Sequence, residues 1–356
     1  MKKYWIPIIV IVIIIIAVVI FYKPAPKEVI KIGALYPLSG SSAAVGEQFL
    51  NGALLAVDII NRAGGVNGRK IELVIDDHQN DPKLGISELQ QRISEGIKFF
   101  IGTNSRVMLS LIPIVKENKV VLFADSSHPD LTGQTKFTFR HAIIAEENAK
   151  IMVDVIKDKD ISSVGILTFN DDYGLVFQKA LVDLVFTHNQ NTKISKDTYL
   201  PTDTDFKTII TKILQNKPGA IFIVGQGNAM GVLIKQIYEL RFRGLLISDF
   251  GPVMTPDVLK IAGDAAKGMY YSKFKDISNE FVSTYEQKFN KEPGNLAFLG
   301  YGDIEILAAA LGKSGEDTDK VSDYILNLKT FNGKYEKMDI TSKGDILPPM
   351  VMDQVK

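Results

Sequence analysis

Apolar and polar positions beyond residue 28 follow two alternating rhythms along the first third of the chain. Short apolar runs typical of buried strands are separated by segments whose apolar residues recur at helical spacing, such as Ile86, Leu89 and Ile93. This order, βαβαβαβ, predicts a parallel sheet covered by helices. We expect strands at 29–35, 71–75, 99–102 and 120–124, and helices at 47–63, 82–96 and 105–118.

A second series of the same kind follows Arg140. Its strands are expected at 164–169, 194–200, 220–224 and 245–248, and its helices at 146–157, 173–188, 206–216 and 228–241. A strand-like run at 268–274 is followed by predicted helices at 279–289, 296–311 and 318–328, and by strands at 334–340 and 350–355. The chain therefore contains two α/β units of similar size, which is typical of two domains.

The N-terminal segment has a different pattern. Nineteen uncharged residues, 4–22, lie between Lys3 and Lys23, which is about long enough to cross a membrane as a helix. Lys2 and Lys3 favour a cytoplasmic N-terminus, so the rest of the chain is expected outside the cell membrane. A cleaved signal is the alternative, although Lys23 and Pro24 stand where a cleavage site needs small residues. We expect a retained anchor at 1–28, including a short polar spacer.

Charge and cysteine content exclude several classes of function. The chain of 356 residues has 41 basic and 41 acidic residues, and it has no run of basic residues, so it lacks the electrostatic signature of a nucleic-acid-binding protein. It has no cysteine, which excludes disulfides, thiol catalysis, zinc–thiolate sites and a lipid-modified N-terminal cysteine.

Motifs for catalysis are weak or missing. The segment from Gly225 to Met230 resembles a dinucleotide-binding loop but lacks its third glycine. Asp249-Phe250-Gly251 matches a kinase motif without the other kinase motifs, and there is no Walker A lysine loop or G-x-S-x-G elbow. Four histidines lack metal-ligand spacing: His78, His128, His141 and His188. The acidic pairs 76–77 and 171–172 are catalytic candidates, but neighbouring carboxylates at strand ends are more often solvated. We therefore expect that the protein is not an enzyme and that it binds no cofactor and no metal.

Several stretches together resemble the type I periplasmic binding proteins of the branched-chain amino acid transport group, which are similar to leucine/isoleucine/valine-binding proteins. The resemblance covers 29 to the C-terminus and rests on the order and spacing of its pieces. These are KIGALYPLSG at 31–40, NRAGGVNGRKIEL at 61–73, IGTNS at 101–105, PDLT at 129–132, Phe139-Arg140 and Asp172-Tyr173-Gly174.

This resemblance implies two Rossmann-like lobes with parallel sheets, joined by a three-stranded hinge and closing on a ligand. The first lobe would consist of 29–140 and 275–328, and the second of 142–271 and 334–356. Phe139-Arg140 lies where the chain would first cross between lobes, so these residues are either part of the hinge or the end of a buried strand.

The resemblance also implies a function. The chain would be an extracytoplasmic solute-binding protein of an ABC importer, with permease subunits and the membrane as partners. Its ligand would be a small polar solute, such as an amino acid or a related amide or amine. A ligand sensor of the same fold, acting through a partner membrane protein, is the alternative, and a secreted or periplasmic form would follow from signal cleavage.

Ligand contacts are expected where strands end, because open parallel sheets bind ligands there. Ser105 matches a hydroxyl that holds a ligand carboxylate in the family, or it is a plain helix N-cap. Ser127 matches the hydroxyl of the next strand end, beside Ser126. Tyr173 matches a tyrosine that closes over the ligand, although it could instead be an exposed residue at a helix start.

The remaining candidates are Gln226, Asp249 and Asp125. Gln226 lies where relatives have an aromatic or polar contact, and Asp249 lies near an acidic residue that binds the α-amine. Asp125 stands where small residues are common, so its carboxylate either binds a ligand amine or points away. Val45 replaces an aromatic that some relatives stack on the ligand. We expect a polar site that favours a zwitterion, a cation or an amide over a dianion.

Overall fold

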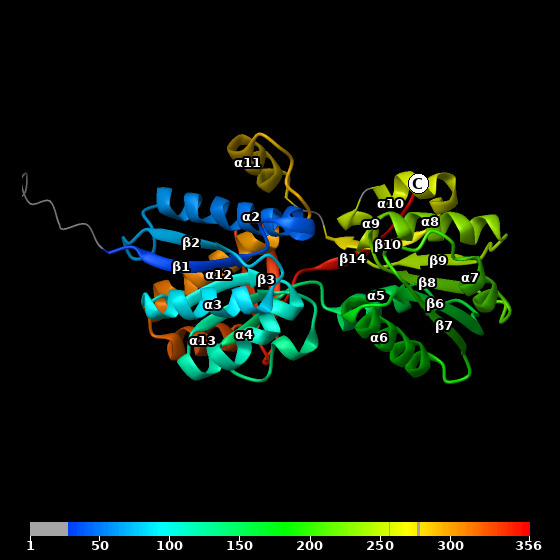
Figure 1. Ribbon diagram of the computed structural model, residues 1–356, viewed down its shortest axis with the longest axis horizontal. Helices are drawn as coiled ribbons and strands as arrows, with labels where there is room; N and C mark the ends of the chain where they lie inside the picture. The colour runs from blue at the N-terminus through cyan, green and yellow to red at the C-terminus, as the bar shows by residue number, and fades with distance from the viewer. Residues whose placement is uncertain (1–27, 256, 276–277) are drawn as a thin grey trace, which may run out of the picture.

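The computed structural model describes residues 28–255, 257–275 and 278–356. It consists of two lobes lying side by side, each with a central sheet flanked by helices (Figure 1). The two-lobed α/β fold predicted from the sequence is therefore confirmed. The predicted membrane anchor falls on residues 1–27, outside the described part of the chain.

The first lobe contains an eight-stranded sheet in the order β11-β12-β13-β5-β4-β3-β1-β2. Strands β1 to β5 and β13 run parallel, while β11 and β12 form an antiparallel edge. In chain order the strands are Ile30–Tyr36, Ile71–Asp77, Phe99–Thr103, Val121–Asp125, Thr138–His141, Thr330–Asn332, Lys337–Ile340 and Asp345–Leu347 (β1 to β5 and β11 to β13). The helices are α2 (Ala43–Arg62), α3 (Pro82–Ser94), α4 (Ser105–Asn118), α11 (Asn279–Phe289), α12 (Ala297–Ser314) and α13 (Thr318–Asn327).

The second lobe contains a six-stranded sheet in the order β14-β10-β9-β8-β6-β7, with β14 antiparallel at one edge. Its strands are β6 (Ser163–Phe169), β7 (Lys193–Tyr199), β8 (Ala220–Val224), β9 (Leu245–Ser248), β10 (Tyr270–Phe274) and β14 (Met350–Gln354). Its helices are α5 (Ala145–Asp154), α6 (Asp172–His188), α7 (Lys207–Leu214), α8 (Gly227–Glu239), α9 (Gly251–Met254) and α10 (Asp257–Ala262).

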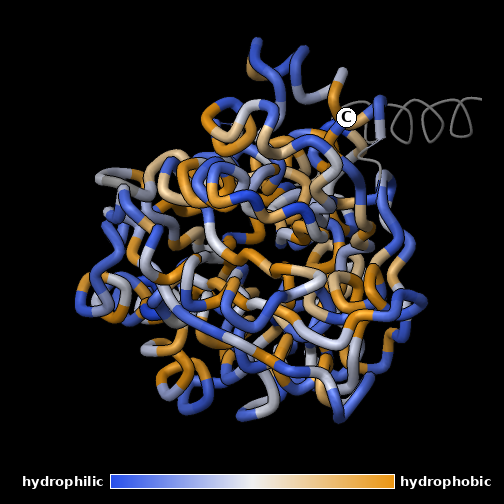
Figure 2. The backbone as a smooth tube through the Cα atoms, turned by 90° about the vertical axis from the view of Figure 1, so that its right-hand side faces the viewer, coloured by the Kyte–Doolittle hydropathy of each residue, from blue (hydrophilic) through white to orange (hydrophobic). Residues whose placement is uncertain are grey.

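The central strands form the cores of both lobes. Every residue of β3, β4, β6 and β8 is buried, as expected for parallel strands covered on both faces. Phe100, Phe123 and Phe222 are completely buried, and each contributes about 2–3 kcal/mol by leaving water. Figure 2 shows hydrophobic backbone segments gathered inside the molecule and hydrophilic segments along its outline.

The chain passes between the two sheets three times: between β5 and α5, between β10 and α11, and between β13 and β14. This confirms the three expected crossings between the lobes. Arg140 itself lies in β5 and is buried, so the first crossing begins only after His141.

The sequence placed all of 334–356 in the second lobe, and for 334–347 this was wrong. β13 pairs in parallel with β5 through Asp345 opposite Arg140, and these two side chains form an ion pair of 2.8 Å between Arg140 Nε and Asp345 Oδ1. β11 and β12 extend the same sheet. Only β14 belongs to the second sheet. The error arose because hydrophobic patterning predicts a strand but does not identify the strand it pairs with.

One helix among the described residues, α2, has the length and apolar composition needed to cross a membrane. It packs against α12 in the first lobe and buries Phe49, Leu55 and Ala56. Its apolar residues are therefore accounted for by the core of the first lobe.

Candidate functional site

A cavity of about 300 Å³ lies between the lobes, where strands of both sheets end. Six of the seven expected ligand-binding residues line it, and the seventh, Asp249, is bonded to one of them. From the first lobe come Val45, Phe49, Thr103, Asn104, Ser105, Asp125, Ser126, Ser127, Leu296 and Leu299; from the second lobe and the first crossing come Ala142, Ile143, Tyr173, Gly225, Gln226 and Met254. Contact between these residues and a ligand stays a prediction.

Ser105 is the first residue of α4 rather than its N-cap, which corrects one interpretation of the sequence. The cap is Asn104, whose side-chain oxygen accepts a hydrogen bond of 3.1 Å from the Val107 amide. Asn104 has a φ of 89°, a conformation that non-glycine residues adopt mainly where the surroundings enforce it. Because Asn104 caps the helix, the Ser105 hydroxyl is not needed for capping.

The loop after β4 supplies two further hydroxyls. The Ser126 hydroxyl is hydrogen-bonded to that of Ser105, which connects this loop to the start of α4. The Ser127 carbonyl accepts a hydrogen bond of 3.0 Å from Arg140 Nη1. Through this bond, the ion pair between β5 and β13 also positions the loop. The first-lobe wall is thus a set of hydroxyls at a helix N-terminus, an arrangement suited to an anion.

Asp125 takes the second of the two orientations considered from the sequence: its carboxylate points away from the cavity. The residue borders the cavity but only 3% of it is exposed, and both of its carboxylate oxygens are buried. Burial, followed by repulsion from Asp303, raises the pKa of Asp125 well above its ordinary value. Asp125 therefore gives less reason to exclude an anionic group from the site than the sequence suggested.

The second-lobe wall is organised around Tyr173 and Asp249. The Tyr173 hydroxyl donates a hydrogen bond of 2.7 Å to Asp249 Oδ2, and the Gly251 amide donates one of 3.1 Å to Oδ1. Complete burial raises the pKa of Asp249 to about 7, while the bonds from Tyr173 and Gly251 oppose the rise. The Tyr173 ring also packs against Phe177 at 4.9 Å. Tyr173 therefore faces the cavity, with an acidic group directly behind its hydroxyl.

Gln226 precedes α8 and is exposed at the rim of the cavity. It makes no side-chain bond to the helix that it precedes. Its amide is therefore available to a ligand.

The cavity also has an apolar wall, which the sequence analysis missed. Phe49 lies one helical turn after Val45 on α2 and lines the same cavity, so an aromatic ring is present one turn from where relatives have it. Ile143 follows β5 at the first crossing, and Leu296 and Leu299 come from the start of α12. The helical spacing of Val45 and Phe49 was a signal that could have identified Phe49. The contribution of α12 had no local signal.

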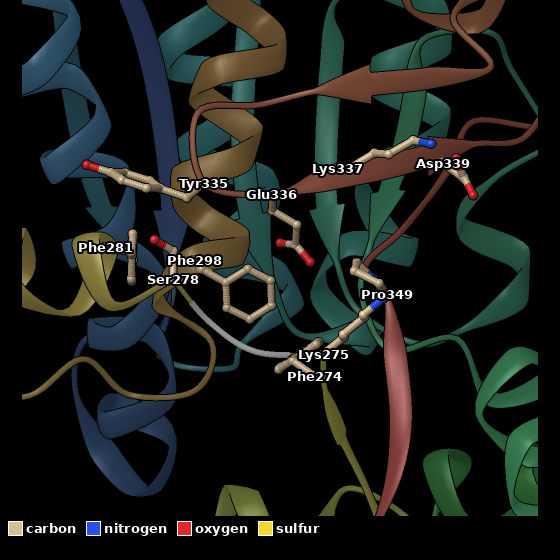
Figure 3. Close-up of a pocket in the computed structure, with 10 residues that line it drawn as sticks. All are labelled: Phe274, Lys275, Ser278, Phe281, Phe298, Tyr335, Glu336, Lys337, Asp339 and Pro349. Carbon is tan, nitrogen blue, oxygen red and sulfur yellow. The ribbon is translucent and has the colours of Figure 1, made fainter.

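A second cavity, of about 370 Å³, lies beside two of the three crossings (Figure 3). Glu336 points toward the Phe298 ring there, and burial raises its pKa to about 8. Lys275 and Pro349 border the cavity from the two crossings. It is larger than the first cavity, but only Phe274 and Pro349 bring it close to strand ends, whereas the loops after β3, β4, β6 and β8 converge on the first cavity. Because open parallel sheets bind ligands at the carboxyl ends of their strands, the first cavity is the better candidate for the ligand site. We name it the cleft cavity.

The model of one protein family, described as periplasmic binding protein, matches residues 29–346. Relatives at the sequence level include the Leu/Ile/Val-binding protein BraC3 of Rhizobium johnstonii, which is 29% identical over 91% of both chains. A leucine-, isoleucine-, valine-, threonine- and alanine-binding protein of Pseudomonas aeruginosa is 27% identical over 90% of this chain and 87% of its own.

A similar solved structure is that of a leucine-binding protein from Thermotoga maritima. It is 26% identical to this chain, with a TM-score of 0.78, and the match covers 92% of this chain and 96% of the other. The likeness therefore extends over both lobes.

Proposed function

Because this chain belongs to the periplasmic binding protein family, we propose that it captures an aliphatic α-amino acid in the cleft cavity for an ABC importer. The observation that carries the proposal is the pairing of two walls. Hydroxyls of Ser105, Ser126 and Ser127 line one side, and Tyr173, backed by Asp249, lines the other. The two walls are complementary to the two charges of a zwitterion.

The ligand carboxylate would bind at the first-lobe wall. The N-terminus of α4 offers backbone amides and a positive end of the helix dipole, and the Ser105 hydroxyl can donate a further hydrogen bond. Asp125 does not oppose this placement, because its carboxylate is buried beneath the wall.

The ligand amine would bind at Tyr173. A tyrosine hydroxyl that donates to a carboxylate keeps its own lone pairs, so the Tyr173 oxygen can accept a hydrogen bond from an ammonium group. Asp249 then supplies the compensating negative charge from behind the tyrosine.

The apolar wall sharpens the ligand class. The sequence left open an amino acid, an amide or an amine. Phe49, Ile143 and Leu299 provide a surface for an aliphatic side chain, whereas a second charged group in the ligand would be buried against them. Relatives are named for binding leucine, isoleucine and valine.

Membership of the family indicates an extracytoplasmic location. We further propose that the segment 1–28 holds the protein at the outer face of the cell membrane, and that the three crossings act as the hinge about which the lobes close on the ligand. Permease subunits would receive the ligand from the closed form.

Isothermal titration calorimetry of the purified full chain tests this proposal with three matched ligands: leucine, leucinamide and 4-methylpentanoate. The amide lacks the carboxylate and the acid lacks the amine. We expect leucine to bind and each analogue to lose at least about 100-fold in affinity, since each leaves one charged wall unsatisfied. Failure of leucine, isoleucine and valine to bind, or binding of either analogue as tightly as leucine, would show the proposal to be wrong.

A further inference from the structure

Four polar side chains meet in the core of the first lobe, beneath the cleft cavity. Tyr36 ends β1, Asp125 ends β4, His141 ends β5, and Asp303 lies in α12. Asp125 is 3% exposed, and the other three are 0% exposed. One nitrogen or oxygen atom from each of Asp125, His141 and Asp303 lies within 4.8 Å of the other two. We name these four residues the buried cluster.

Most polar atoms of the buried cluster have no hydrogen-bond partner among the residues that the structure describes. These atoms are both carboxylate oxygens of Asp125, Oδ2 of Asp303, Nε2 of His141 and the hydroxyl of Tyr36. Within the cluster, His141 Nδ1 and Asp303 Oδ1 form a hydrogen bond of 2.8 Å, and Asp125 and Asp303 lie close enough to share a proton. Buried polar groups in native proteins are normally hydrogen-bonded. This number of unpaired polar atoms at one place therefore indicates a missing partner.

The missing partner is a cation or a shared proton. Two carboxylates in a dry core repel each other and lose their hydration, and an unpaired buried charge is strongly destabilising. Arg140, the residue before His141, is committed elsewhere: its Nε donates to Asp345 at 2.8 Å and its Nη1 to the Ser127 carbonyl at 3.0 Å. No other arginine or lysine is bonded to the cluster within the described ranges.

We infer that Asp125, His141 and Asp303 form a binding site for a divalent first-row transition metal ion, with the Tyr36 hydroxyl as a fourth polar group beside it. Two carboxylates and an imidazole are ligands that zinc and similar ions use, and a dication balances both negative charges. His141 Nδ1 and Asp303 Oδ1 lie 2.8 Å apart, close enough to bind one ion together.

The spacing of the ligand atoms fits this assignment. In tetrahedral coordination with metal–oxygen and metal–nitrogen bonds of about 2.0–2.2 Å, two ligand atoms lie about 3.3–3.6 Å apart. The separations in the buried cluster are no larger than 4.8 Å, so side-chain movements of no more than about 1.5 Å bring the atoms into range. The Tyr36 pKa is raised by burial and then by Asp125 and Asp303, in agreement with its position beside both carboxylates.

An ion at this place would join the ends of three strands and one helix directly below the cleft cavity. Asp125 precedes the loop of Ser126 and Ser127, and His141 precedes the first crossing. Metal binding would therefore fix the first-lobe wall and the start of the hinge in one arrangement. The inference does not depend on which solute occupies the cleft cavity.

The test uses the full chain, purified without a polyhistidine tag, stripped with a chelator and then dialysed against Zn²⁺. We expect about one zinc ion per chain and a higher melting temperature for the loaded than for the stripped protein. Mg²⁺ should give no such shift, because it retains its waters and prefers oxygen ligands. Retention of no zinc by the wild-type chain, with the same melting temperature after stripping, would overturn the inference without any variant.

Variants locate the ion. Asp125→Asn, Asp303→Asn and His141→Gln should each abolish zinc retention, whereas His188→Gln, on the exposed end of α6, should retain it. Co²⁺ loaded in place of zinc should give a visible absorption band that is lost in His141→Gln. Equal zinc retention in wild type and a folded Asp125→Asn protein would show that the metal binds elsewhere. If Asp125→Asn does not fold, the cobalt spectrum of the wild type decides, since its absence contradicts the site.

Discussion

Each lobe buries an aspartate where a strand ends beside the cleft cavity: Asp125 is the last residue of β4, and Asp249 follows β9. Both are almost inaccessible, and burial raises the pKa of both. Their partners differ. Asp249 accepts hydrogen bonds from Tyr173 and Gly251, whereas no donor bonds the carboxylate of Asp125 among the described residues.

This difference shows that a position in the fold does not determine what a side chain does. Donors around Asp249 hold its carboxylate against the wall of the cavity, where its charge can serve a ligand. Asp125 faces Asp303 and the interior, where only a cation or a proton can compensate it. Sequence position alone made both candidates for binding an amine, and the structure leaves Asp249 as the better one.

Replacing Asp249 should have the largest effect on ligand binding. Asp249→Asn keeps the shape of the side chain but removes the charge behind Tyr173, so we expect leucine affinity to fall about 100-fold, or about 2.7 kcal/mol. Calorimetry of the folded variant measures the loss. An affinity within threefold of the wild type would mean that the ligand amine is held elsewhere.

Tyr173→Phe should have the next largest effect, a loss of about 10-fold to 20-fold in affinity. The phenyl ring keeps its packing against Phe177 but cannot accept a hydrogen bond from the amine or donate one to Asp249. Competition with radiolabelled leucine measures it. Phe177→Leu is the matched control for loss of ring packing, and a larger effect there would assign the role of Tyr173 to packing.

The pH dependence of leucine binding should follow the ionisation of Asp249. With its pKa raised to about 7, about one tenth of Asp249 is ionised at pH 6, so affinity there should be about tenfold weaker than on the alkaline plateau. Tyr173 and Tyr199 also face this group, and both stay neutral over this range, since burial raises the pKa of both. Titrations with leucine at several pH values should show that affinity rises with pH in the wild type and does not change with pH in Asp249→Asn.

The same shift has a consequence of opposite sign for stability. Because the pKa of Asp249 is raised in the folded protein, its contribution to the free energy of unfolding is fully present below the ordinary value of 3.8 and is lost as the pH rises through about 7. Asp249→Asn should therefore gain stability relative to wild type as the pH rises from 5 to 8, measured by urea unfolding without ligand. A constant difference across this range would contradict the raised pKa.

Ser105→Ala should weaken leucine binding by about 3-fold to 10-fold, the range for one hydrogen bond to a charged or polar group. The helix should keep its stability, because Asn104 provides the cap. Asn104→Ala is the contrasting variant, expected to lower the melting temperature as well. A lower melting temperature for Ser105→Ala would show that Ser105 contributes to capping the helix.

Asp125→Asn should have the smallest direct effect on leucine binding, within about threefold when both proteins are compared without metal, since its carboxylate does not face the cavity. A loss comparable with that of Asp249→Asn would remove the contrast between the two aspartates.

Most helices and strands could be predicted because their signals are local. The limits expected for α4, β8, β9 and α11 agree with the structure, where apolar periodicity ends at turn or cap residues. The short strands β5 and β13 were not predicted as strands. Their sequences carry little local strand signal, since β13 joins the sheet by pairing with β5 some 200 residues earlier in the chain.

The candidate site was predictable to the extent that it follows strand ends. Ser105, Tyr173 and Gln226 were predicted because they follow parallel strands and match positions of the family, whereas Leu299 lines the cavity from a helix far along the chain. No pattern in the sequence indicated the buried cluster. His141 and Asp303 have no metal-ligand spacing, and only the fold brings them to Asp125.

The place where β1 begins has a mechanical consequence. Its strand ends at the cleft with Tyr36, so its start, Ile30, lies at the outer end of the first lobe, remote from the second lobe (Figure 1). A membrane tether joined there, as proposed, would pull on one lobe only. The second lobe could then move during closure without stretching the tether.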